Sequence, residues 1–78
     1  MTVRQKLEAL LEHIANQPEG EWDNSYEPSR FPPNIDSEAE LWSLSKELSD
    51  RGLVIRNAYM DGSFNLRITT RGRIAAGQ

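Results

Sequence analysis

The side chains best suited to chemistry in this sequence are cations, and most of them lie in its second half. Residues 51–78 contain five arginines and one carboxylate, a net charge of +4, whereas residues 1–50 contain four cations and eleven carboxylates, a net charge of −7. A cluster of guanidinium groups can form an anion-binding face that the overall charge of −3 conceals. The candidates for such a face are Lys46, Arg51, Arg56, Arg67, Arg71 and Arg73. Attraction between the acidic and the basic half of the chain is the alternative explanation.

Aromatic side chains form a second set of candidate contact residues. Three of them lie in residues 17–35, a segment that also holds all four prolines of the chain, and a fourth follows shortly after it. They are Trp22, Tyr26, Phe31 and Trp42. We expect the first three to hold a long ordered loop against the core. Large aromatic residues are also common anchors of protein interfaces, so the same set is a candidate site for a protein partner.

No combination of residues indicates catalysis. The chain has no cysteine, a single histidine (His13) and no glycine-rich phosphate loop. Neither a nucleophile with its base nor a set of metal ligands can therefore be recognised. We expect no enzymatic activity, no metal and no cofactor. The absence of cysteines and of long apolar runs leads us to expect a cytoplasmic protein with no membrane contact.

Two helices are predicted, over residues 2–16 and 37–51. Thr2 and Ser37 are each followed three positions later by Gln or Glu, which is the spacing of a capping box at a helix start. Gly52 directly follows the second helix, as expected for a residue that adopts positive φ at a helix end. Apolar residues recur at helical spacing in both segments and should pack with the strands that follow. The expected core residues are Val3, Leu7, Leu10, Leu11, Ile14, Leu41, Leu44, Leu48, Ile55, Leu66 and Ile68.

A β-hairpin is predicted over residues 53–60 and 63–70. Both segments are rich in β-branched and aromatic residues, and the Asp-Gly pair between them is a strong signal for a two-residue type I′ turn. That turn places Arg56 opposite Arg67 on the solvent face. Since like charges opposite each other are unfavourable, we expect that replacing both arginines by glutamine would not lower the melting temperature.

The run from Leu48 to Val54, followed by a hairpin and by Ile68-Thr69-Thr70-Arg71-Gly72, resembles the recognition helix and wing of bacterial winged-helix DNA-binding domains. The resemblance covers the second half of the chain. It implies a single small α+β domain over residues 1–78, with two main helices, a long ordered loop at residues 17–35 and the hairpin as a C-terminal wing. It also implies DNA binding and transcription regulation. A winged-helix domain has its second helix in about the place of that loop.

Two functions therefore remain open for a non-enzymatic binding module. The first is the binding of duplex DNA through the Arg-rich hairpin. The acidic residues of the predicted helix 37–51 oppose this function, because they repel the phosphate backbone. The second is a protein–protein interaction that uses the aromatic residues and makes no nucleic-acid contact.

Overall fold

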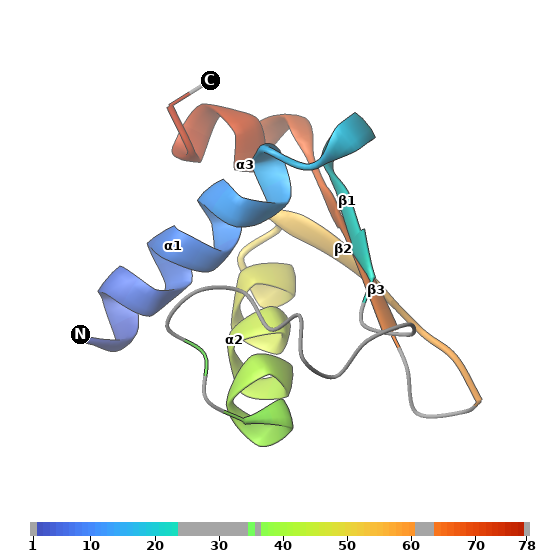
Figure 1. Cartoon of the computed structure of the whole chain (residues 1–78). Helices are drawn as coiled ribbons and strands as arrows, with labels where there is room; N and C mark the ends of the chain where they lie inside the picture. Colours follow the sequence, from blue (N-terminus) through green and yellow to red (C-terminus); the bar gives the residue numbers. More distant parts are fainter. Residues whose placement is uncertain (1, 24–34, 36, 61–63, 78) are drawn as a thin grey trace.

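The computed structural model describes residues 2–23, 35, 37–60 and 64–77. In chain order its elements are helix α1 (Val3–Ala15), the 3₁₀ turn η1 (Pro18–Gly20), strand β1 (Glu21–Asp23), helix α2 (Glu38–Asp50), strands β2 (Val54–Ala58) and β3 (Phe64–Ile68), and helix α3 (Thr70–Ala75). They form a small α+β domain with one three-stranded antiparallel sheet (Figure 1). The expected α+β class is confirmed, and the sheet has one strand more than the expected hairpin.

Both long helices begin where their capping residues place them. The hydroxyl of Thr2 accepts the main-chain N–H of Gln5, whose side chain accepts the N–H of Thr2 in return. Ser37 accepts the N–H of Glu40 at the start of α2. After α2, Gly52 has a φ of +73°, a conformation that costs glycine little. The two helices thus lie within one residue of the predicted ranges at each end.

The third strand lies in a segment that was predicted to be loop. β1 pairs with β3 and sets Trp22 opposite Leu66, so the strand order is β1-β3-β2. Glu19 and Gly20 adopt positive φ in η1, where the chain passes from α1 into the sheet. The expectation of a loop throughout residues 17–35 is therefore wrong for η1 and β1. A strand of three residues is too short for its periodicity to be recognised in the sequence.

The two strands of the predicted hairpin pair one residue away from the expected register. Arg56 lies opposite Leu66, and Ile55 lies opposite Arg67, so the expected pair of arginines does not form. Because side chains alternate across a strand, this shift exchanges the two faces of β2. Val54 is buried as a result, while Ile55 is 52% exposed. The Asp-Gly turn from which the register was predicted lies outside the described residues.

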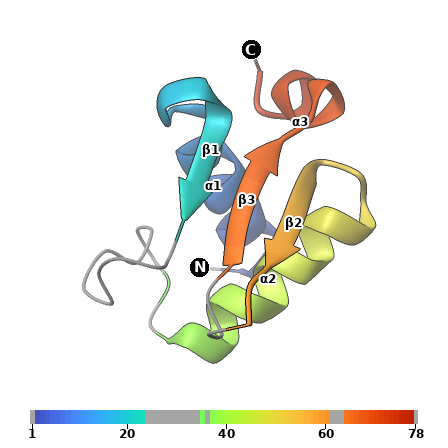
Figure 2. The same cartoon turned by 90° about the vertical axis from the view of Figure 1, so that its right-hand side faces the viewer.

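The core lies between one face of the sheet and the helices α1 and α2, which Figure 2 shows behind the strands. Its buried apolar residues are Leu7, Leu10, Leu11, Ile14, Ala15, Ile35, Leu41, Leu44, Leu48, Val54, Phe64, Leu66 and Ile68. Two expected members are instead exposed. Val3 lies in the first turn of α1 and is 68% exposed, and Ile55 is replaced by Val54 because of the register.

Helix α3 occupies the end of the predicted last strand and the residues after it. β3 ends at Ile68, and the hydroxyl of Thr69 accepts the N–H of Gly72 while donating to the carbonyl of Gly52. Gly72 packs so closely on the carbonyl of Leu53 that a Cβ atom at this position would overlap the oxygen. A third helix is therefore fixed against the turn after α2, in addition to the two main helices that were expected.

Candidate interaction surface

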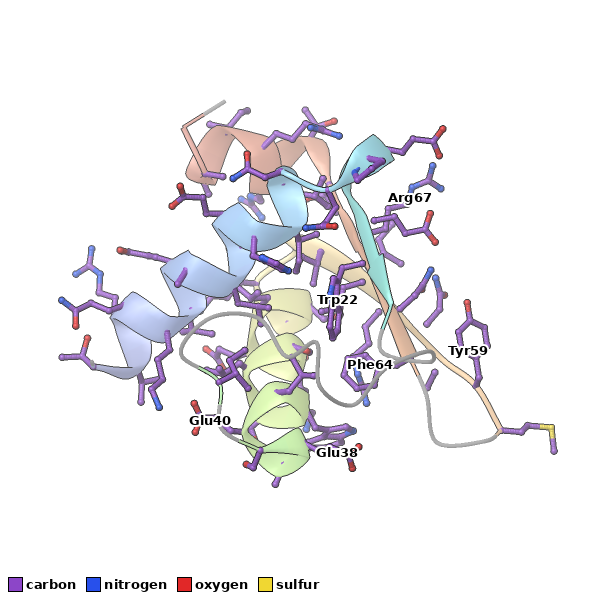
Figure 3. All side chains as sticks on the ribbon, in the orientation of Figure 1. Trp22, Glu38, Glu40, Tyr59, Phe64 and Arg67 are labelled. Carbon is purple, nitrogen blue, oxygen red and sulfur yellow. The ribbon has the colours of Figure 1, made fainter. Side chains whose placement is uncertain are left out.

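Arg56 is the centre of a stack of side chains between α2 and the sheet. Its guanidinium carbon lies 5.0 Å from the ring centroid of Trp42 and 5.3 Å from that of Phe64. Phe64 in turn meets Trp22 edge to face, with ring centroids 6.4 Å apart and an interplanar angle of 63° (Figure 3). The Nε of Arg56 is buried without a hydrogen-bond partner among the described residues. Attraction between the cation and the ring faces therefore holds this side chain inside the domain.

The outward face of α2 carries an aromatic ring among charged residues. Trp42 is 46% exposed, and Nζ of Lys46 lies 5.7 Å from its ring centroid. The Nε of Arg51 forms an exposed ion pair of 2.9 Å with Glu47. The exposed carboxylates of the helix are those of Glu38, Glu47 and Asp50. This face is thus acidic overall, with its cations engaged by neighbours on the same helix.

The remaining predicted cations lie outside α2, on strand β3 and on helix α3. Arg67 is exposed on the face of the sheet that points away from the helices (Figure 3). Arg71 lies beside Gly52, and Arg73 lies beside Gly20. With Arg56 turned inward, the structure does not bring the six predicted cations together on one surface.

The outer face of the sheet is crossed by a row of polar side chains. Asn65 is buried in this row, where its Nδ2 donates to a carboxylate oxygen of Glu21 and its Oδ1 accepts from Nδ2 of Asn57 at 3.1 Å. Ile55 and Arg67 are exposed on the same face. Because the row joins all three strands, its hydrogen bonds order the sheet and leave Ile55 as an uncovered apolar side chain.

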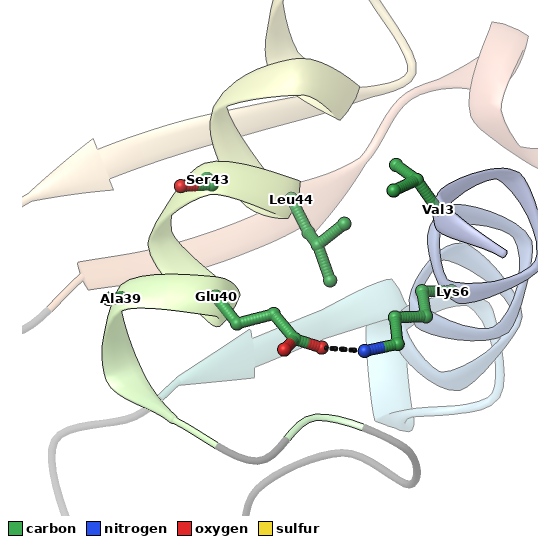
Figure 4. Close-up of a pocket in the computed structure, with 6 residues that line it drawn as sticks. All are labelled: Val3, Lys6, Ala39, Glu40, Ser43 and Leu44. Atoms are coloured by element: carbon green, nitrogen blue, oxygen red, sulfur yellow. Dashed lines mark hydrogen bonds and ion pairs between the residues drawn. The ribbon is translucent and has the colours of Figure 1, made fainter. Parts of the chain in front are cut away.

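A hollow of about 430 Å³ opens between α1 and α2 (Figure 4). It is lined by Val3, Lys6, Ala39, Glu40, Ser43 and Leu44. Nζ of Lys6 lies 2.7 Å from the carboxylate of Glu40, and both side chains are less than one third exposed. Since the two charged groups of the hollow are already paired with each other, they are poorly suited to bind a charged small molecule.

Of the aromatic residues predicted as partner anchors, the two that the structure describes lie at opposite ends of the stack around Arg56 and differ in exposure. Trp22 is partly buried and packs against the core, whereas Trp42 is half-exposed on α2. Tyr26 and Phe31 lie outside the described residues. Tyr59, which follows β2 and is 50% exposed, is a candidate contact residue that the predicted register concealed. The alternation of Ile55, Asn57 and Tyr59 was the sequence signal that could have revealed it.

His13 lies in the last turn of α1 and is partly buried. Burial lowers the pKa of its imidazole, because the charged form loses hydration. Its Nε2 lies 3.5 Å from the amide nitrogen of Gln17, which also donates to the carbonyl of His13. Burial of the ring in the packing of α1 is thus a sufficient cause of the lowered pKa.

Neither a metal site nor a membrane span is found in the part of the chain that the structure describes. No group of three or more His, Cys, Asp or Glu side chains within those residues is placed to hold a metal ion. None of the described helices has the length and apolar content required to cross a membrane. Comparisons with protein-family models, with curated proteins and with solved structures found no match for this chain.

Proposed function

We propose that this chain is a non-enzymatic binding module with a winged-helix arrangement, and that its partner is a protein. The order helix, short strand, helix and hairpin, with the short strand added to the hairpin, supports the winged-helix resemblance. In that arrangement α2 is the recognition helix, and β2 with β3 is the wing. Residues 24–34, where such a domain has its further helix, lie outside the described residues.

The observation that carries the protein proposal is the acidic character of α2. A recognition helix that enters a DNA groove comes close to phosphates on both sides, and carboxylates in that position are repelled. The outward face of α2 has three exposed carboxylates, and one of its cations, Arg51, is already paired with Glu47. A basic protein surface is therefore a better complement to this helix than duplex DNA is.

Trp42 supplies the anchor for such a complex. Interface residues that contribute most to affinity are often tryptophans that enter a pocket on the partner. Trp42 is half-exposed, and its contact with Arg56 restrains the ring before a partner binds. Restraint in the free protein reduces the entropy lost on association. The expected partner thus presents an apolar pocket bordered by lysine or arginine side chains.

Duplex DNA is the second candidate, and the positions of Arg67 and Arg71 favour it. Both side chains are exposed, and neither forms an ion pair with another described residue. They belong to the wing and to the helix directly after it. In this case the wing and α3 would contact phosphates in place of α2, and the affinity would fall steeply as the salt concentration rises.

An amide chemical-shift titration with a short DNA duplex at low salt separates the two candidates. The protein proposal expects no saturable shift in α2 or in the wing. Salt-dependent shifts that centre on Arg67 and Arg71 would support the DNA candidate instead. Their loss in an Arg67→Gln, Arg71→Gln variant that melts like the parent would establish it.

Affinity capture with matched variants tests the role of α2 directly. Trp42→Ser removes the anchor, Glu47→Lys reverses an exposed charge of the same helix, and Val3→Ser changes an exposed apolar residue on another helix as the control. A specific partner is expected to bind the parent and the control equally and to be lost with both α2 variants, and the purified partner should reproduce this order. Equal binding by all four proteins would exclude α2 as the binding face.

A further inference from the structure

β2 is an edge strand, and some of its main-chain groups are not paired with any strand that the structure describes. In the part of the chain that the structure describes, the order β1-β3-β2 leaves one side of β2 without a neighbouring strand (Figure 2). The N–H of Thr69 donates to the carbonyl of Leu53 at 3.0 Å, and these residues continue the register of β2 with β3. Because such bonds alternate in antiparallel pairs, the odd-numbered residues of β2 direct their main-chain groups toward β3 and the even-numbered residues direct theirs outward. Among the described residues, these outward groups form no main-chain hydrogen bond beyond the sheet.

Of the features that normally prevent strand pairing, this edge has an inward charge, that of Arg56, whose guanidinium is already engaged by Trp42. Edge strands of monomeric proteins are commonly protected by proline, lysine or inward-pointing charges. Residues 54–60 contain no proline, lysine or carboxylate, and their single charge, Arg56, is held over Trp42. Three apolar side chains are exposed here instead. They are Ile55, Tyr59 and Met60, at 52%, 50% and 106% exposure.

We propose that this edge pairs with β2 of a second copy of the chain, antiparallel about a two-fold axis at Asn57. In this register Ile55 of each copy lies opposite Tyr59 of the other copy. One interface therefore contains two such pairs, which cover the exposed side chains of both copies. Pairs of an aromatic with a β-branched residue are among the favourable cross-strand pairs. The register also sets Arg56 opposite Ala58 of the second copy, which lets the outward main-chain groups of both residues exchange hydrogen bonds.

The neighbouring registers are less favourable, and this comparison selects Asn57 as the centre. Residues that lie opposite each other in a sheet direct their side chains to the same face. The two-fold axis can therefore lie at a residue of β2 but not between two residues. A centre at Arg56 sets two arginines directly opposite each other, which is destabilising. A centre at Ala58 sets Tyr59 opposite Asn57 and removes Ile55 from its aromatic partner. Of these three registers, only the one centred at Asn57 pairs Ile55 with Tyr59 and separates the charges.

Sedimentation equilibrium of the whole chain, from micromolar to millimolar concentration, tests the proposal. We expect a monomer–dimer equilibrium. Ile55→Lys with Tyr59→Lys sets like charges opposite each other and should abolish the dimer, whereas Ile55→Lys with Tyr59→Glu sets opposite charges across each pair and should retain it. Ile74→Lys, a change at a residue of α3 that is 71% exposed, is the control and should dimerise like the parent.

Two results would overturn the proposal. One is a parent chain that stays monomeric across the whole range, and the other is a dimer that both charge variants form equally. Circular dichroism establishes that the variants fold. If the variants do not fold, a measurement on the parent keeps the test decisive. In a mixture of isotope-labelled and unlabelled parent chains, nuclear Overhauser contacts are expected between the methyl groups of Ile55 in one copy and the ring of Tyr59 in the other. A dimer without those contacts would also contradict the register.

Discussion

Arg56 lies over the ring of Trp42, with its guanidinium carbon 5.0 Å from the ring centroid, and so joins the sheet to α2. The contact depends on the observed register, since a shift of one residue would turn Arg56 to the outer face of the sheet. The same shift would exchange buried Val54 for Ile55. The stack over Trp42 and the burial of Val54 therefore favour the same strand pairing.

We predict that Arg56 stabilises the fold. Arg56→Gln should lower the free energy of unfolding by about 1 kcal/mol, because a cation over aromatic rings contributes roughly 0.5–2 kcal/mol depending on its desolvation. Arg67→Gln is the matched control on the exposed face, and it should change that free energy by less than about 0.5 kcal/mol. Urea unfolding measures both. A double variant that is as stable as the parent, as the sequence had led us to expect, would show that the stack contributes nothing.

Gly72 should tolerate no side chain. A Cβ atom at this position would overlap the carbonyl oxygen of Leu53 and crowd the side chain of Ile68, so either α3 or the turn after α2 must move. Gly72→Ala is expected to lower the free energy of unfolding by roughly 1–3 kcal/mol, the usual range for overpacking. Thr70→Ala, an exposed change in the same helix, is the control. Thermal melts that coincide for Gly72→Ala and the parent would mean that α3 is not packed as described.

The helices could be predicted because their ends are determined locally. Thr2 and Ser37 cap the residues that directly follow them, and Gly52 adopts the positive φ that a helix end requires. Each of these interactions spans only a few residues, so a single sequence contains the information. β1 could not be predicted in this way, because its three residues are held by pairing with β3, far away in the chain.

The candidate site was harder to predict because it depends on the register. Trp42 and its acidic neighbours could be recognised from their helical spacing. Whether Arg56 faces solvent or the core depends on which residue of β3 lies opposite, and a shift of one position reverses the answer. Burial of Val54 and the stack on Trp42 are tertiary contacts, and they oppose the register that the Asp-Gly turn alone would favour. The predicted register consequently placed Arg56 and Arg67 on the same face of the hairpin, whereas in the structure they lie on opposite faces.

His13 should make the stability depend on pH. Its pKa in the folded state is lowered by burial, whereas in the unfolded chain the pKa is near the ordinary value of 6.5. The unfolded chain therefore binds more protons between the two values, and stability must fall as the pH decreases from about 6.5 through the folded pKa. Above about pH 6.5 the imidazole is neutral in both states, so protonation of His13 no longer lowers the free energy of unfolding. His13→Gln should reduce the loss of stability between about pH 7.5 and about pH 5.5, as measured by urea unfolding. An unchanged pH profile would assign that loss to other groups.

The ion pair between Lys6 and Glu40 should contribute more than an ordinary surface pair. Its side chains are 23% and 28% exposed and join α1 to α2 at 2.7 Å, whereas Arg4 and Glu8 are 87% and 68% exposed within one helix at 3.4 Å. Partial burial reduces solvent screening, so a double-mutant cycle with Lys6→Met and Glu40→Gln should give a coupling of about 0.5–1 kcal/mol.

The cycle with Arg4→Met and Glu8→Gln is the matched control, since it tests the same charges without contact between helices. Its coupling should be close to zero and should disappear at high salt, because exposed pairs are screened. The coupling of Lys6 and Glu40 should persist in part at the same salt concentration. If both couplings are equal and vanish together, the two helices are not held by this pair. The hollow between them would then have to keep its shape through the apolar contacts of Leu44 with the core.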